Sequence, residues 1–101
     1  MSLTTRNLRP SVLAFALAME ERLRANDHKG GWTDCTVYYL TGRLQEEVFE
    51  LERAALVGYG EEPDAGEVRA EAADVADFAM MLADVCVGLV TPEAGAARRR
   101  A

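Results

Sequence analysis

Two pairs of acidic residues lie on segments whose apolar residues recur at helical spacing, and this conflict restricts the possible folds more than any other feature. The pairs are Glu47 with Glu50 and Glu71 with Asp74, each three residues apart. At about 3.6 residues per turn, Glu47 and Glu71 lie on the apolar stripes of their helices. A buried carboxylate without a partner costs several kcal/mol or more. The sequence therefore predicts that a cation lies beside these side chains.

The apolar periodicity predicts an all-α fold with three main helices. These helices are expected at about residues 11–25, 35–57 and 64–90, separated by two glycine-bearing connections. Asp64 stands three residues before Glu67, which is the spacing of a capping box and marks the start of the third helix. The short connection between the second and third helices favours antiparallel packing. That packing would bring the two acidic pairs to the same depth.

The length of the chain limits it to one domain with a modest core. With 101 residues, it buries a large apolar surface only if it associates with copies of itself. We therefore expect residues 1–92 to form a single domain, whose four-helix-type bundle core is completed by oligomerisation. Residues 93–101 are alanine-rich and contain three consecutive arginines, and we expect them to form a flexible tail.

Charge and hydropathy exclude several kinds of partner. The net charge of -6 argues against nucleic acid and against an anionic membrane surface. The apolar stretch 12–18 continues in helical register to Leu23, so we interpret it as helix and not as a secretion signal. No segment approaches the roughly 18 apolar residues that a transmembrane helix requires. A cytoplasmic protein with Cys35 and Cys86 as reduced thiols is the simplest interpretation, although the sequence leaves a disulfide between them open.

The third predicted helix cannot neutralise its own acidic residues. No lysine or arginine occurs between Arg69 and Arg98. The acidic residues of this predicted helix lie at spacings at which like charges repel, and they are Glu67, Glu71, Asp74, Asp77 and Asp84. Carboxylate oxygens without a nearby histidine suit Mg²⁺ or Mn²⁺ better than zinc. We expect Asp77 to be either a further metal ligand or an acceptor of a hydrogen bond from a metal ligand.

The second predicted helix offers an alternative to a metal. Arg43 precedes Glu47 by four residues and Arg53 follows Glu50 by three, so both carboxylates can form ion pairs within their own helix. The acidic third helix makes a metal the stronger hypothesis, because it has no such internal partner. The sequence by itself leaves both arrangements possible for Glu47.

The two acidic pairs and their surroundings resemble a known family. The segments are Leu44-Gln45-Glu46-Glu47-Val48-Phe49-Glu50-Leu51 and Glu71-Ala72-Ala73-Asp74-Val75-Ala76-Asp77-Phe78. In this order they are similar to the E-x-x-E and E-x-x-D motifs of the MazG-like, all-α nucleoside triphosphate pyrophosphohydrolases. The resemblance covers approximately residues 29–83. It implies that Glu47, Glu50, Glu71 and Asp74 are metal ligands.

The resemblance also implies an activity and an assembly. Members of this family use Mg²⁺ to cleave a nucleoside triphosphate to the monophosphate and pyrophosphate, and they assemble as homodimers or homotetramers. This chain is short for the family, so another subunit would have to complete the pocket or the pocket would stay open. Either Glu47 or Glu50 is a candidate to accept the proton of the attacking water.

Three further residues are candidates for substrate binding. Lys29, in the glycine-bearing loop, can neutralise a triphosphate or remain solvated. Trp32 can stack on a nucleobase or anchor the start of the second helix. Arg43, one turn before Glu47, can reach a phosphate or pair with that carboxylate.

Two other functions remain compatible with the sequence. Phosphoribosyl-ATP pyrophosphohydrolase, an enzyme of histidine synthesis, belongs to the same superfamily and uses similar acidic helices. A non-catalytic helical module for nucleotide binding or dimerisation is the other. The presence of all four acidic residues favours an enzyme, most simply one that removes canonical or damaged nucleotides from the nucleotide pool.

Overall fold

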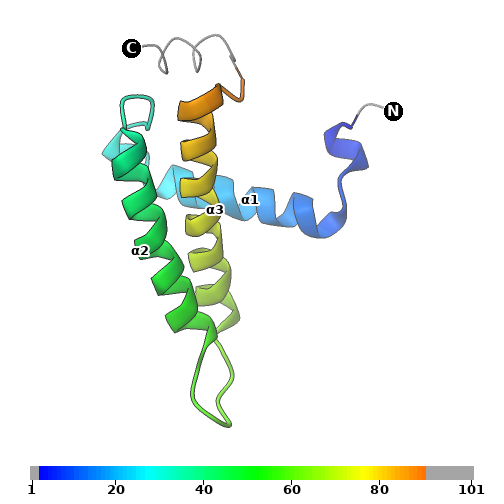
Figure 1. Cartoon of the computed structure of the whole chain (residues 1–101). Helices are drawn as coiled ribbons and strands as arrows, with labels where there is room; N and C mark the ends of the chain where they lie inside the picture. Colours follow the sequence, from blue (N-terminus) through cyan, green and yellow to red (C-terminus); the bar gives the residue numbers. More distant parts are fainter. Residues whose placement is uncertain (1–2, 91–101) are drawn as a thin grey trace.

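The protein is all-helical, as the sequence predicts. The computed structural model describes residues 3–90, and these contain no strand; the predicted tail 93–101 lies outside them. The elements are the 3₁₀ helices η1 (Thr5–Asn7) and η2 (Asp27–Lys29) and the α-helices α1 (Pro10–Ala25), α2 (Val37–Ala55) and α3 (Ala65–Val87) (Figure 1). The two 3₁₀ helices were not predicted from the sequence.

Capping side chains and one glycine set the ends of the two acidic helices. The Thr36 side chain accepts from the amide of Tyr39 at 3.0 Å, so α2 begins at Val37 and not at residue 35. The predicted cap of α3 is confirmed, because Asp64 accepts from the amide of Glu67. Gly88 adopts a φ of +65°, which ends α3 at Val87 and not at residue 90.

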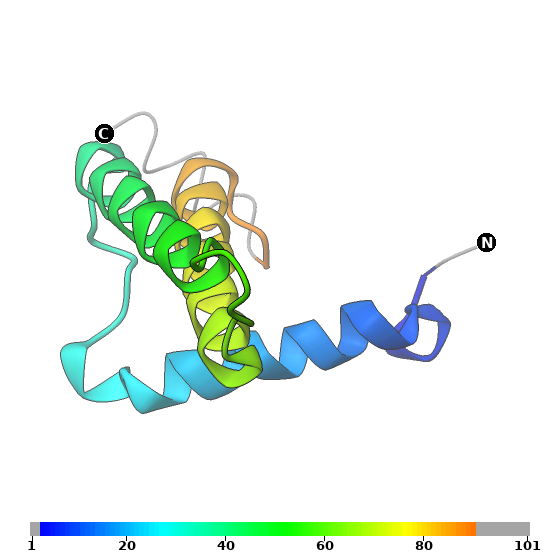
Figure 2. The same ribbon diagram turned by 90° about the horizontal axis from the view of Figure 1, so that it is seen from below.

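The antiparallel hairpin of α2 and α3 is the framework of the molecule. The two helices lie side by side, and α1 runs crosswise over α3, with its N-terminal half extending beyond the hairpin (Figures 1 and 2). Helix α3 therefore packs against both α1 and α2. Acidic residues on α3 consequently meet side chains from two different helices.

The buried core is small and contains mainly small side chains. Its apolar residues are Ala18, Leu40, Ala54, Ala73 and Val85. Larger apolar residues remain partly exposed, such as Leu17 in α1, at 60%, and Phe49 in α2, at 58%. Exposed apolar side chains in this number are typical of surfaces that meet another protein.

Neither a membrane-spanning helix nor a disulfide occurs in the described part of the chain. None of the helices within residues 3–90 is long and apolar enough to cross a bilayer. Cys35 and Cys86 are both free cysteines.

Leu40 should be the most sensitive position in the hairpin, because its side chain is completely buried. We expect Leu40→Ala to lower the free energy of unfolding by about 2–5 kcal/mol through lost burial and the cavity left behind. Urea unfolding followed by circular dichroism measures this change. Leu56→Ala is the matched control because Leu56 is 77% exposed. Equal losses in the two variants would contradict this packing of α2.

Candidate metal centre

Three of the predicted ligands come together where α2 packs against α3. Glu47 of α2 and Glu71 and Asp74 of α3 each contribute an oxygen, and these oxygens all lie within 4.8 Å of one another. The antiparallel hairpin brings them to the same depth, as expected from its short connection. Glu50 is exposed and Asp77 is buried, and neither belongs to this group of three. We call Glu47, Glu71 and Asp74 the acidic cluster.

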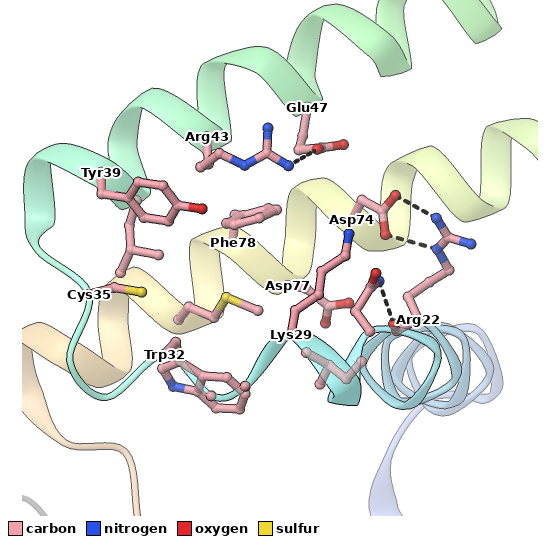
Figure 3. A pocket seen from close by; sticks show the side chains of 16 residues that line it. Arg22, Lys29, Trp32, Cys35, Tyr39, Arg43, Glu47, Asp74, Asp77 and Phe78 are labelled. Atoms are coloured by element: carbon pink, nitrogen blue, oxygen red, sulfur yellow. Dashed lines mark hydrogen bonds and ion pairs between the residues drawn. The ribbon is translucent and has the colours of Figure 1, made fainter.

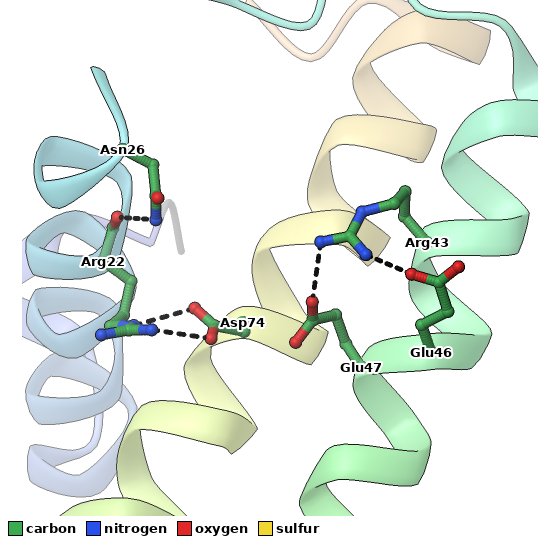
Figure 4. Close-up of polar contacts among 6 residues, drawn as sticks. All are labelled: Arg22, Asn26, Arg43, Glu46, Glu47 and Asp74. Carbon is green, nitrogen blue, oxygen red and sulfur yellow. Dashed lines mark hydrogen bonds and ion pairs between the residues drawn. The ribbon is translucent and has the colours of Figure 1, made fainter. Parts of the chain in front are cut away.

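An arginine that the sequence analysis missed pairs with the cluster. Arg22 of α1 donates from Nε and Nη2 to the two carboxylate oxygens of Asp74, both at 2.9 Å (Figure 4). Such a two-pronged pair is among the stronger hydrogen-bonded ion pairs. No pattern in the sequence singles out Arg22. In the structure it follows the buried Ala18 by four residues, which places it on the face of α1 that meets α3.

Arg43 connects α2 with α3 beside the cluster. Its guanidinium donates to Glu47 at 3.0 Å and also to Glu46, and it lies over the Phe78 ring at 5.0 Å from the centroid (Figure 4). The ion pair within α2 that the sequence left open is therefore present. The expected pair of Arg53 with Glu50 is replaced by a position of Arg53 over the Phe49 ring.

Two carboxyl groups of the cluster have raised pKa values in spite of these arginines. Burial raises the pKa of Glu47, and the negative charge of Asp74 raises it further. Burial likewise raises the pKa of Glu71, with added repulsion from Asp74 and Glu47. Additional positive charge at this point would therefore be stabilising.

Asp77 is a buried carboxyl group with unsatisfied hydrogen-bonding capacity. Its side chain is one turn after Asp74 in α3, the residue is 3% exposed, and Oδ1 has no hydrogen-bond partner. Burial, assisted by the negative charges of Asp74 and Glu20, raises the pKa of Asp77 to about 7. Buried polar atoms without a partner are rare and call for an explanation.

A cavity of about 510 Å³ adjoins the acidic cluster. This volume lies within the range of about 300–1,000 Å³ that is usual for small-molecule sites. Arg22, Glu47 and Asp74 line one end, which we call the charged end, and Trp32 and Tyr39 line the other, which we call the aromatic end (Figure 3). The other predicted site residues on its wall are Lys29, Arg43 and Asp77.

The loop before α2 forms the wall of the cavity opposite the hairpin. Gly30 adopts a φ of +86° after the short helix η2, a conformation that favours glycine. The Trp32 indole N–H donates to Asp84 of α3 at 2.9 Å, while the Trp32 ring lines the cavity. Trp32 is thus an anchor of the loop and part of the cavity wall. Asp84, which we had not placed in the site, fixes this position.

The chemistry of the acidic cluster fits a small, hard cation. Oxygens bound to one Mg²⁺ at about 2.0–2.1 Å in octahedral geometry lie about 2.9–4.2 Å apart, so oxygens within 4.8 Å of one another would have to move closer to hold the ion together. Asp74 would have to share or release its hydrogen bonds with Arg22.

No family model, curated protein or solved structure matches this chain, so the carboxylate donors and the cavity are the observations that bear on function.

The unusual pKa of Asp77 predicts a pH dependence of stability in metal-free protein. The folded state holds this proton more tightly than the unfolded state, since the pKa rises from 3.8 to about 7 on folding. The stabilisation is complete below about pH 4 and is lost as the pH rises to about 7. Over this range we expect the wild type to lose on the order of 4 kcal/mol relative to Asp77→Asn.

Urea unfolding at a series of pH values with EDTA present measures this difference. Glu62→Gln, which removes an exposed carboxylate, is the control and should follow the wild type. Parallel pH profiles for the wild type and Asp77→Asn would contradict the predicted pKa.

Proposed function

We propose that the protein is a Mg²⁺-dependent nucleoside triphosphate pyrophosphohydrolase that converts NTP or dNTP and water to the monophosphate and pyrophosphate. The observation that supports this most is the acidic cluster at one end of a cavity whose walls also carry cationic and aromatic side chains. A phosphate chain needs the cations, and a nucleobase needs the aromatic rings. The biological role we propose is removal of unwanted nucleotides from the pool.

Glu47, Glu71 and Asp74 would hold the metal, for which Mn²⁺ is a possible substitute. Glu50, one turn further along α2, stays a predicted ligand that would have to turn inward from its exposed position. When bound, Mg²⁺ polarises phosphate oxygens and makes an attacking water easier to deprotonate. Asp77 has a different environment, since it is buried and lies outside the acidic cluster.

The residues of the chain supply the remaining parts of the reaction. Lys29, Arg22 and Arg43 offset the negative charge of the triphosphate. The oxygen of a water molecule forms a bond to the α-phosphorus while the bond from that phosphorus to the oxygen bridging the α- and β-phosphates breaks, and pyrophosphate leaves with that oxygen and the electron pair. Glu47 is the preferred acceptor of the water proton, since it belongs to the acidic cluster and its pKa is raised by burial.

The proposal includes an assembly of two or four chains. Exposed apolar side chains along α1, such as Val12, Leu13 and Leu17, support it, because a small domain gains stability by covering such a surface. Light scattering of the purified protein gives its mass directly, and the mass of a single chain would remove this part of the proposal.

Arg22 should compete with metal for Asp74. We expect Arg22→Gln to bind Mn²⁺ about three- to tenfold more tightly than the wild type, because Asp74 is then free of its hydrogen-bonded cation. Electron paramagnetic resonance of free Mn²⁺ measures the affinity. Arg24→Gln removes the same charge from the neighbouring turn, where Arg24 pairs with Glu20, and should change the affinity much less. Weaker binding by Arg22→Gln would show that Arg22 positions Asp74 for the metal.

Release of pyrophosphate tests the activity itself. A panel of canonical and modified nucleoside triphosphates with Mg²⁺ should contain substrates of the wild type. We expect Glu47→Gln and Asp74→Asn to lower kcat by about a hundredfold or more, because each removes a charged ligand. Glu52→Gln is the control, because it makes the same kind of change at an exposed glutamate of α2, and it should retain activity.

The outcome of the panel separates the competing functions. Turnover by the wild type and loss in both cluster variants, with helical content unchanged, would support the proposal. Turnover of phosphoribosyl-ATP alone would assign the alternative enzyme. Nucleotide binding without turnover of any compound would replace the proposal with a non-catalytic module.

A further inference from the structure

Asp77 occupies a place in the cavity that the metal hypothesis does not explain. It lines the cavity between Asp74 at the charged end and Trp32 at the aromatic end (Figure 3). It does not belong to the acidic cluster, and neither Arg22 nor Arg43 donates a hydrogen bond to it. A buried carboxyl oxygen without a partner is destabilising, so a group that satisfies it on binding would gain a corresponding advantage.

The position of Asp77 along α3 indicates which part of a nucleotide it would meet. With a rise of about 1.5 Å per residue, Asp77 lies about 4.5 Å from Asp74 along the axis of α3. Met81, which also lines the cavity, lies about 10.5 Å from Asp74 in the same direction. If the phosphates bind at the charged end, a nucleobase extends to the aromatic end. The sugar then lies between them, at the level of Asp77.

The chemistry of a carboxyl group matches the hydroxyl groups of a ribose. An ionised carboxylate accepts hydrogen bonds through two oxygens, and two adjacent hydroxyls supply two donors at matching separation. Rotation about the terminal side-chain torsion of aspartate is soft, so Oδ1 can turn toward the cavity without a change of backbone. Acidic residues bind ribose hydroxyls in this way at dinucleotide sites of another fold.

We propose that Asp77 binds the 2′- and 3′-hydroxyls of the sugar and makes the site selective for ribonucleotides over deoxyribonucleotides. This inference rests on the proposed function, because it takes the phosphates to bind at the acidic cluster. It assigns Asp77 as a specificity-determining residue and not as a metal ligand. A water molecule held permanently at Oδ1 is the competing explanation, and it predicts no dependence on the sugar.

A scan of the sugar hydroxyls tests the inference. The substrates are a nucleoside triphosphate with the base that the wild type turns over best and its 2′-deoxy, 3′-deoxy and 2′,3′-dideoxy forms. For the wild type we expect kcat/KM to fall about tenfold or more for each hydroxyl removed, since each donates to a charged acceptor. In Asp77→Ala the effect of removing a hydroxyl on kcat/KM should shrink to about threefold or less. In Asp77→Asn the effect should lie between those of the wild type and the alanine variant.

The comparison is made between sugars within one variant, so a general loss of folded protein does not change it. Glu20→Gln is the matched control, because Glu20 is an exposed acidic residue of α1 whose charge acts on Asp77. This variant should keep the sugar sensitivity of the wild type. Equal sensitivity in the wild type and Asp77→Ala, or no sensitivity in the wild type, would overturn the inference.

A binding measurement separates this inference from the proposed activity. Calorimetry with α,β-imido ribonucleoside triphosphate and its dideoxy form, in the presence of Mg²⁺, reports sugar recognition without turnover. One outcome is binding that depends on the sugar in the wild type but not in Asp77→Ala, without hydrolysis of any triphosphate. This outcome would support sugar binding by Asp77 and overturn the proposed hydrolase activity. Turnover with unaltered sugar sensitivity would overturn the role of Asp77 alone. Neither binding nor turnover would overturn both.

Discussion

Mutual repulsion among carboxylates, held close together by helix packing, is the constraint on which the site depends. The hairpin of α2 and α3 fixes one carboxylate oxygen of each of Glu47, Glu71 and Asp74 within 4.8 Å of the others. The charge of Asp74 adds to burial in raising the pKa of Glu47 and of Glu71. Such a concentration of negative charge is stable only beside positive charge. In this structure the guanidinium groups of Arg22 and Arg43 supply it from two sides.

The placement of those two arginines connects stability with the proposed chemistry. Arg22 reaches the cluster from α1, and Arg43 reaches it from α2 while lying over Phe78 of α3. Both also line the cavity, so the cations that stabilise the metal-free protein are positioned to meet a phosphate group. Exchange of an arginine for a metal ion at Asp74 would then release a donor toward the ligand. The same two arginines would thereby act both in stabilising the fold and in the proposed site.

One wall of the cavity depends on a loop that is fixed by a residue distant in the sequence. The loop before α2 is held by the hydrogen bond from Trp32 to Asp84 near the far end of α3. The same Asp84 carboxylate accepts from the amide of Leu89, just past the end of that helix. The cavity wall opposite the hairpin therefore depends on residues 52 positions apart in sequence. A short chain can form a pocket of small-molecule size in this way without an additional helix.

Much of the architecture was predictable from local signals in the sequence. Apolar periodicity located three helices, and the Asp64 cap fixed the start of α3, because these features involve neighbours within one or two turns. The ends at Val37 and Val87 differ from the predicted ends by two and three residues, because the Thr36 side chain caps α2 and Gly88 adopts a left-handed conformation after α3. Helix caps of this kind are easily confused with nearby polar residues.

The sequence by itself determined that two acidic helices form an antiparallel hairpin, because its periodicity and short connection are local properties. It also required a cation beside the acidic residues of α3, which have no basic residue three or four positions away on their own helix. Only the tertiary structure decided that Arg22 of α1 supplies one, that Glu50 faces outward and that Asp77 is buried without a partner at Oδ1. The physical reason is that the crossing of α1 over α3 joins residues about 50 positions apart, and no local pattern encodes such a contact.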